Sequence, residues 1–171
     1  RIDEKMGLIE LVMTMAYKGG VNYTDVMGTT AIWDSIIYRE LNKQKIAIPP
    51  NEEKFKSDYP GGYVKDPQVG SHDWVVSFDL NSLYPNLIVQ YNMSPETLLN
   101  SAQGDVCVAA NGAAFTKKFQ GMLPRIIISY SDERKAIKKD MLTAMQNNQR
   151  NPSDETEREI NRLENRQMAI K

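Results

Sequence analysis

The longest helical pattern in the chain, residues 125–147, limits the possible folds more than any other feature. Its apolar side chains recur at helical spacing and share one broad face: Ile127, Tyr130, Ile137, Met141 and Met145. A polar connector over residues 147–152 follows, and Ser153 begins a second helical pattern that runs to the last residue. Two long helices joined by about six residues pack antiparallel. The sequence therefore predicts a helical hairpin.

The rest of the chain mixes helical and strand patterns. The expected elements are helices over residues 2–17, 29–41 and 83–91, a strand over residues 74–78, and an irregular loop or a hairpin over residues 100–116. Gly19 and Gly20 are expected to end the first helix, and Thr29 or Thr30 to cap the second. A polar surface connector is expected over residues 42–58. The length of 171 residues suits one domain or two small ones.

Composition favours a soluble globular protein and excludes several classes of site. Hydrophobic residues make up 41% of the chain, charged residues 25%, and the formal net charge of -1 gives no sign of nucleic-acid binding. A single cysteine, Cys107, excludes an intrachain disulfide framework, and a single histidine, His72, argues against a His-rich zinc site. No apolar run approaches the ~20 residues that span a membrane, and no signal peptide is visible. An intracellular location is therefore expected.

An acidic residue, Asp79, stands at the end of the expected strand and is followed by a short turn. A carboxylate held there can bind a hard cation such as Mg²⁺, which takes few protein carboxylates. Backbone N–H groups of the turn can point at phosphate oxygens, and Tyr84 can place its ring beside the attached sugar. The alternative is that Asp79 forms a turn or caps a helix and that Tyr84 is a packing residue. One carboxylate is also too few for two-metal chemistry.

Basic side chains gather in the first helix of the predicted hairpin. Residues 125–150 hold six basic and three acidic residues, a local excess that the whole chain lacks. Arg134 and Lys138 lie four apart and share a helix face, and both side chain types bind phosphate. The alternative reading is a solvated helix face with no ligand.

Residues 77–86, which read SFDLNSLYPN, resemble motif A of family B DNA polymerases, whose core is D-x-x-S-L-Y-P-S. Asn86 stands where Ser is usual. Residues 92–97, NMSPET, resemble the T4-like phage branch of that family. The chain also begins without Met inside a helical pattern and stops inside another, so we expect a fragment of such a polymerase.

Three further segments are similar to the same family. Residues 121–139 resemble the first fingers helix of T4-like polymerases, and residues 165–171 resemble the approach to motif B, K-x-x-x-N-S-x-Y-G. Residues 59–62 resemble the Y-x-G-G element between the exonuclease region and the palm. The asparagine, tyrosine and glycine of motif B are absent from the chain.

The resemblance implies a role for each motif A position. Asp79 is expected to bind both Mg²⁺ ions of the complete enzyme, and the Leu80 carbonyl to bind the ion on the nucleotide side. Ser82 and Leu83 are expected to offer backbone N–H groups to the incoming triphosphate. Tyr84 is expected to act as the steric gate, because a ribose 2′-OH would collide with its ring.

The other segments imply further contacts. Arg134 and Lys138 are expected to contact the β- and γ-phosphates of the nucleotide. Lys171 would be the opening lysine of motif B, which binds the triphosphate and acts as general acid. Tyr59, Gly61 and Gly62 are expected to contact template phosphates, because the glycines let the backbone approach closely.

The implied fold is α+β: a partial polymerase palm of short antiparallel strands and helices, with a protruding antiparallel helical hairpin as fingers. Residues 1–58 are expected to connect the exonuclease region to the palm, residues 59–123 to form the partial palm, and residues 124–171 to form the fingers. Primer-template DNA, dNTP, the remaining polymerase chain and a sliding clamp are the expected partners, in the host cytoplasm of a phage.

The implied activity is transfer of a deoxynucleotide to a primer 3′-OH by two-metal catalysis. The isolated chain is expected to be inactive, since it lacks the second acidic palm motif, D-T-D. An alternative is a degenerate palm–fingers module that serves binding or assembly without catalysis. A primase or reverse transcriptase palm is disfavoured by Tyr84 and by the long fingers helices.

Overall fold

The computed structural model describes residues 3, 7–48, 50 and 61–170. In this part the helices are α2 (Leu8–Gly19), α3 (Thr29–Lys43), α4 (Leu83–Gln90), the 3-10 turn η1 (Pro95–Thr97), α5 (Met122–Arg150) and α6 (Asp154–Ile170). The strands are β1 (Leu98–Leu99), β2 (Val106–Val108) and β3 (Ala114–Thr116). The predicted α+β class is confirmed.

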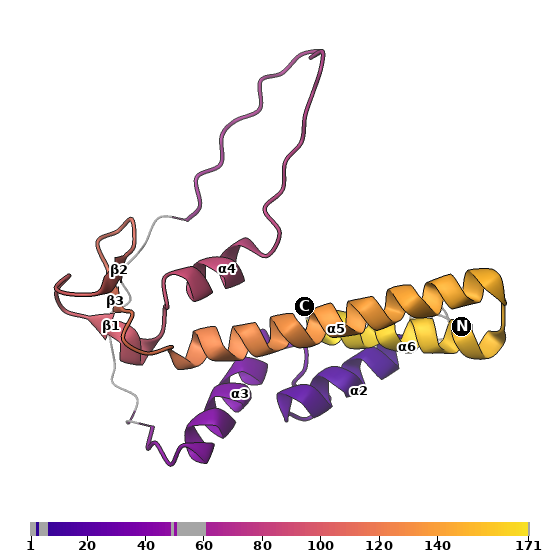
Figure 1. Ribbon diagram of the computed structural model, residues 1–171, viewed down its shortest axis with the longest axis horizontal. Helices are drawn as coiled ribbons and strands as arrows, with labels where there is room; N and C mark the ends of the chain where they lie inside the picture. Colours follow the sequence, from indigo (N-terminus) through magenta and orange to yellow (C-terminus); the bar gives the residue numbers. More distant parts are fainter. Residues whose placement is uncertain (1–2, 4–6, 49, 51–60, 171) are drawn as a thin grey trace.

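The predicted helical hairpin is formed by α5 and α6, which lie antiparallel along most of their length (Figure 1). α5 continues to Arg150, so the connector is shorter than the sequence predicts. Ser153 caps α6 as expected, because its hydroxyl accepts the N–H of Thr156 at 3.1 Å. Ile137 of α5 and Leu163 of α6 are buried at 4% and 7% exposure. These apolar side chains bury the inner faces of the hairpin.

Two shorter helices, α2 and α3, pack beside the hairpin, and α2 contacts both α6 and α3. Gly20 ends α2 in the left-handed conformation, with φ at 68°, as predicted. A Cβ at Gly20 would lie 2.9 Å from the Arg39 guanidinium, so a larger residue there would displace the end of that side chain. The predicted threonine cap of α3 is wrong. Gly28 occupies the N-cap, and no side chain makes a capping hydrogen bond there.

The three short strands form one antiparallel sheet in the order β1-β3-β2. Phe115 of β3 pairs with Leu98 on one side and with Cys107 on the other. Of the two alternatives for residues 100–116, the hairpin is therefore correct. The sheet lies at the end of the molecule from which α5 starts (Figure 1).

A cluster of buried polar side chains joins α4, the sheet and α5. Asn92 is 8% exposed, and its amide nitrogen donates to the carbonyl oxygens of Thr116 and Phe119 at 2.6 and 2.8 Å. Its amide oxygen accepts the N–H of Gly121 at 2.8 Å. One side chain therefore ties the end of α4 to the segment that starts α5.

The buried Ser94 and Thr97 and the exposed Glu96 complete this cluster, and with Asn92 they are called the polar hub below. Thr97 is fully buried, and its hydroxyl donates to the Asn92 carbonyl at 2.6 Å. The Glu96 carboxylate accepts the N–H of Met122, in the first turn of α5. A Cβ on Gly121 would come within 2.6 Å of the Ser94 Cβ, so the backbone fits against the hub only as glycine. The hub thereby fixes where α5 begins.

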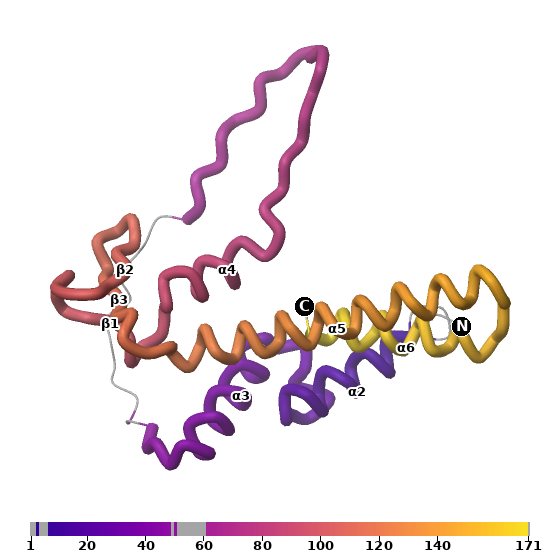
Figure 2. Tube along the Cα trace, in the orientation of Figure 1, coloured from indigo at the N-terminus to yellow at the C-terminus, as the bar shows by residue number. Residues whose placement is uncertain are grey.

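The predicted strand over residues 74–78 is wrong. This segment is extended but forms no strand, and Trp74 adopts a left-handed conformation with φ at 57°. A strand requires a neighbour to pair its N–H and C=O groups, and no described segment pairs with it. Residues 61–80 instead run out and back as a long loop, away from the helices (Figure 2).

Candidate functional site

The acidic turn predicted to bind metal lies at the end of this exposed loop, immediately before α4. Asp79 is exposed, and the Leu80 side chain is 68% exposed. The carboxylate therefore stays open to solvent and to an incoming ligand. It is not buried among packed side chains, which would have excluded a metal-binding role.

The turn then enters α4 through a residue in an unusual conformation. Ser82 is the N-cap of α4, with φ 53° and ψ 43° in the left-handed region, which costs a non-glycine residue of the order of 1 kcal/mol. Asn86 braces the turn, because its side-chain amide donates to the Asn81 carbonyl at 3.0 Å. Asn86, which stands where Ser is usual in the motif, therefore stabilises the turn in this chain.

The N-terminus of α4 carries no capping side chain. The N–H groups of the first helical turn have no partner within a helix, and together with the helix dipole they favour an anion. Tyr84 projects from this turn and is 76% exposed. An open carboxylate, uncapped N–H groups and an exposed aromatic ring thus lie within a single turn of chain, residues 79–84.

The basic residues predicted to bind phosphate lie on α5, which contacts α4. Arg134 is half-buried and Lys138 is exposed. Their neighbour Lys135 pairs with Asp132 at 3.0 Å, whereas neither Arg134 nor Lys138 forms an ion pair with any described residue. The two side chains therefore stay available to a ligand.

Other predicted site residues are placed only partly. Tyr59 and Lys171 lie outside the described residues. Gly61 and Gly62 are exposed, and a Cβ on either would meet no atom within 4 Å. No described residue therefore demands glycine at the two positions.

The donor set for a cation is incomplete within the described ranges. No group of three or more His, Cys, Asp or Glu side chains converges there. One exposed carboxylate, Asp79, beside the Leu80 carbonyl suits part of a Mg²⁺ shell, which is otherwise filled by water and phosphate oxygens. None of the described helices combines the length and the apolarity that crossing a bilayer requires.

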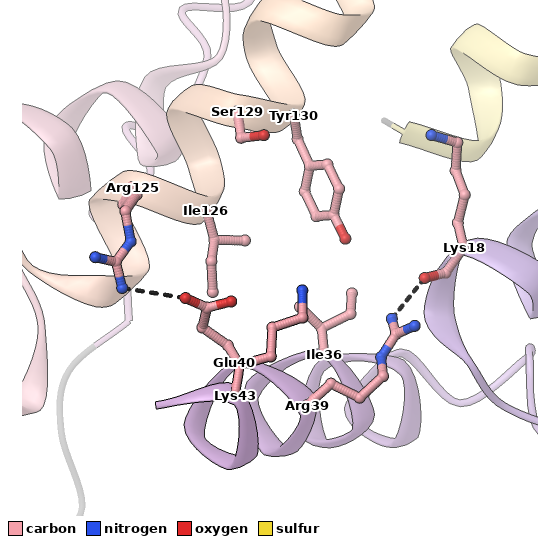
Figure 3. Close-up of a pocket in the computed structure, with 9 residues that line it drawn as sticks. All are labelled: Lys18, Ile36, Arg39, Glu40, Lys43, Arg125, Ile126, Ser129 and Tyr130. Atoms are coloured by element: carbon pink, nitrogen blue, oxygen red, sulfur yellow. Dashed lines mark hydrogen bonds and ion pairs between the residues drawn. The ribbon is translucent and has the colours of Figure 1, made fainter. Parts of the chain in front are cut away.

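A basic cavity between α2, α3 and α5 was not anticipated from the sequence. Its four cationic side chains are Lys18, Arg39, Lys43 and Arg125 (Figure 3). They come from three helices whose packing the sequence does not specify. The available signal was the i, i+4 spacing of Arg39 and Lys43, but the predicted helix ended at residue 41, whereas α3 continues to Lys43.

Comparison with known proteins gives consistent matches. The family described as DNA polymerase family B matches residues 26–171. The chain is 30% identical over 162 residues to the DNA-directed DNA polymerase of Enterobacteria phage T4, and 32% identical over 163 residues to that of Escherichia phage RB69. These alignments cover 85% and 86% of this chain but 18% of each relative.

Archaeal polymerases are similar as well. The DNA polymerase of Pyrococcus horikoshii is 36% identical over 133 residues, which cover 77% of this chain and 10% of the relative. The family B DNA polymerase structure from Pyrobaculum calidifontis superposes with a TM-score of 0.70 at 24% identity. It covers 99% of this chain and 22% of the archaeal one. The fold of this chain is therefore that of one region of a much larger polymerase.

Proposed function

Because this chain belongs to DNA polymerase family B, we propose that it supplies motif A and the fingers of a DNA-directed DNA polymerase. The reaction is attack of a primer 3′-OH on the α-phosphate of a dNTP, with release of pyrophosphate. The observation that carries this proposal is the turn at residues 79–84. There an open carboxylate, a strained N-cap and an exposed tyrosine follow one another at the uncapped start of α4.

Asp79 and the Leu80 carbonyl are the groups that would hold metal in this turn. Two bound Mg²⁺ ions would lower the pKa of the 3′-OH and stabilise the leaving pyrophosphate. The chain's own part is to present the Asp79 oxygens free of packing, which their exposure supports. Further acidic ligands must come from a second palm motif such as D-T-D, so the isolated chain is inactive.

The nucleotide is proposed to lie against the start of α4. Backbone N–H groups of Ser82 and Leu83 would bind triphosphate oxygens at the positive end of the helix dipole. The Tyr84 ring would lie beneath the deoxyribose and exclude a 2′-OH. Arg134 and Lys138 would close onto the β- and γ-phosphates when the fingers move. Lys171 would bind the triphosphate and protonate the pyrophosphate.

The remaining assignments concern the surroundings of the site. Residues 1–58 would connect an exonuclease region to the palm, residues 59–123 would form part of the palm, and residues 124–171 would form the fingers. Tyr59, Gly61 and Gly62 would contact template phosphates. The working enzyme would require primer-template DNA, the rest of the polymerase and a sliding clamp, in the cytoplasm of a phage host.

The test is primer extension by this chain combined with a companion chain that carries motif C and the thumb. Asp79→Ala should lower kcat by about a thousandfold or more, because a lost metal ligand removes several kcal/mol of transition-state stabilisation. Asp73→Ala is the matched control, since Asp73 is an exposed aspartate of the same loop and should change kcat less than about twofold.

The outcomes separate this proposal from its alternative. The degenerate palm–fingers module, a non-enzymatic binding or assembly piece, is favoured by one observation: no group of three or more His, Cys, Asp or Glu side chains that could hold a metal forms among the described residues. If Asp79→Ala and Asp73→Ala support equal extension, the polymerase role of Asp79 is wrong. Incorporation of labelled dNTP by this chain alone would instead refute its proposed inactivity.

A further inference from the structure

A cavity of about 460 Å³ opens between α3 and the first turns of α5, with the end of α2 at its side (Figure 3). This volume lies within the range of small-ligand sites. Its wall combines polar groups with apolar surface, to which Ile36 and Ile126 contribute. The residues that line it include none of those proposed above to hold metal or nucleotide.

Positive charge predominates in this cavity, although the chain as a whole carries -1. Four cationic side chains face one carboxylate, that of Glu40. Glu40 is already engaged, because it pairs with Arg125 at 3.2 Å. Lys18 likewise pairs with Glu133, which lies outside the cavity lining. With these pairs neutralised, the charges of Arg39 and Lys43 remain.

Arg39 is held in place by the end of α2. One guanidinium nitrogen donates to the carbonyl oxygens of Lys18 and Gly19 at 2.7 and 3.1 Å, and the group lies over Gly20, where no Cβ intrudes. A guanidinium has five N–H donors, so donors remain for a ligand. Because this arginine is already oriented, little side-chain entropy is lost when it binds a further acceptor.

Lys43 lies one helical turn beyond Arg39, and its amine points into the cavity (Figure 3). It forms no ion pair with any residue in the described part of the chain. Across the cavity, the Tyr130 hydroxyl points inward from α5, with Ser129 beside it (Figure 3). Burial raises the pKa of Tyr130, against the opposing charge of Arg39. The phenol therefore stays a hydrogen-bond donor at neutral pH.

Two cations and a phenol that converge from two helices make a site for an oxyanion. An arginine side chain can donate two parallel hydrogen bonds to two oxygens of one phosphate, and lysine adds a point charge. A carboxylate ligand would leave most of this volume empty, whereas a phosphate with its sugar fills a larger part of it. The cavity is partly open to solvent, so it can admit one phosphate group of a longer molecule.

We propose that this cavity binds one phosphate group of a nucleic-acid strand, through Arg39, Lys43 and the Tyr130 hydroxyl. The preference for phosphate rests on these side chains alone. The assignment of this phosphate to a nucleic-acid strand, and not to free phosphate, rests on the proposed function, because a polymerase binds nucleic-acid strands. The cavity thus adds a backbone contact beneath the fingers that needs no metal and no base recognition.

The test is titration of the full chain into a fluorescein-labelled single-stranded oligothymidylate at several salt concentrations. One lost phosphate contact on a single strand lowers the salt slope by about 0.7, which is roughly a tenfold weakening at 50 mM salt. Lys43→Ala should show this loss. Lys117→Ala, which removes an equal charge from the exposed end of the sheet, should change binding less than about twofold.

Tyr130→Phe removes only the hydroxyl and should weaken binding about tenfold, which corresponds to one hydrogen bond to a charged group. Equal weakening by Lys43→Ala and Lys117→Ala would overturn the proposal, because it would show diffuse attraction. Absence of oligonucleotide binding would overturn it too.

Inorganic phosphate is the second probe. If it displaces the oligonucleotide at concentrations as low as the strand's own phosphate concentration, the site takes free phosphate and the strand assignment is wrong. Oligonucleotide binding is measured without Mg²⁺ and without dNTP, separately from primer extension. A failure of the polymerase proposal, detected by primer extension, is thereby distinguished from a failure of this cavity.

Discussion

The polar hub and the long loop over residues 61–80 lie close together in sequence but differ in burial and in hydrogen bonding. Thr97 and Asn92 of the hub are 0% and 8% exposed and have hydrogen-bonding partners on several elements. Residues 61–80 of the loop are exposed throughout, and Phe78 within it is 91% exposed. The hub satisfies its polar groups inside the chain. The loop leaves its apolar side chains without packing partners among the described residues, and its Gln68 carbonyl has a partner only within the loop, the His72 ring.

This difference separates two kinds of requirement in the sequence. Hub residues are needed for this chain to hold its own shape, since a buried polar group without a partner is costly. The apolar residues of the loop have nothing to pack against within the described part, so their value lies in contacts with other molecules or segments. Mutations should therefore affect stability in the hub and activity in the loop.

Asn92→Ala should have the largest effect on stability. It leaves the carbonyls of Thr116 and Phe119 and the N–H of Gly121 without their partner, at a cost of about 3 kcal/mol in the free energy of unfolding. Denaturant unfolding followed by circular dichroism measures this change. Asn100→Ala is the exposed control, expected within about 0.5 kcal/mol of wild type. Equal effects of the two changes would contradict the account of the hub.

Glu96→Gln should have a smaller, pH-dependent effect. Burial alone would raise the pKa of Glu96, but hydrogen bonds from Ser94 and Met122 and the charge of Arg125 lower it below its ordinary value of 4.5. A carboxyl with a lowered pKa stabilises the fold above that ordinary value, and its contribution is lost as pH falls through the folded-state pKa. The variant should lose about 1 kcal/mol at neutral pH, as for a lost helix cap.

The measurement is the free energy of unfolding of wild type and Glu96→Gln between pH 7 and pH 3. The gap between the two proteins should narrow on the acid side of pH 4.5, where the wild-type carboxylate gains its proton. If the difference in free energy of unfolding between the two proteins stays constant over this range, the charge of Glu96 does not stabilise the start of α5.

Val76→Ala in the loop should have the smallest effect. Val76 is 70% exposed, so truncation should change the free energy of unfolding by less than about 0.5 kcal/mol. Val26 is the matched valine, 3% exposed, and its truncation should cost about 2 kcal/mol. A large loss of stability in Val76→Ala would mean that the loop packs within the chain and that the contrast with the hub is false.

Periodicity in the sequence predicted the helical parts because their signals are local. The hairpin of α5 and α6, the glycine stop of α2 and the helix after Ser82 all follow from apolar spacing and end signals in the sequence. The strand over residues 74–78 failed because a strand also depends on a distant partner. Its residues are of the types that favour a strand, but no described segment forms the neighbouring strand with which its backbone could hydrogen-bond.

The candidate site divides in the same way. Asp79, Ser82 and Tyr84 stand in one short string, so their proximity could be read from sequence spacing. The hub and the basic cavity could not, because Asn92 meets Gly121 and Arg39 meets Lys18 only after several elements have packed. Resemblance to a family identified the string of residues, and the three-dimensional packing revealed the groups around it.

Ribonucleotide discrimination tests the central claim most directly. In primer extension with the companion chain, Tyr84→Ala should raise the kcat/KM for a ribonucleotide relative to its deoxy counterpart by roughly 10–100-fold. This range corresponds to relief of about 1–3 kcal/mol of steric overlap with the 2′-OH. Tyr84→Phe keeps the ring and should leave the ratio unchanged. If the alanine variant discriminates as well as wild type, Tyr84 does not lie beneath the sugar, and the proposed nucleotide position at the start of α4 is wrong.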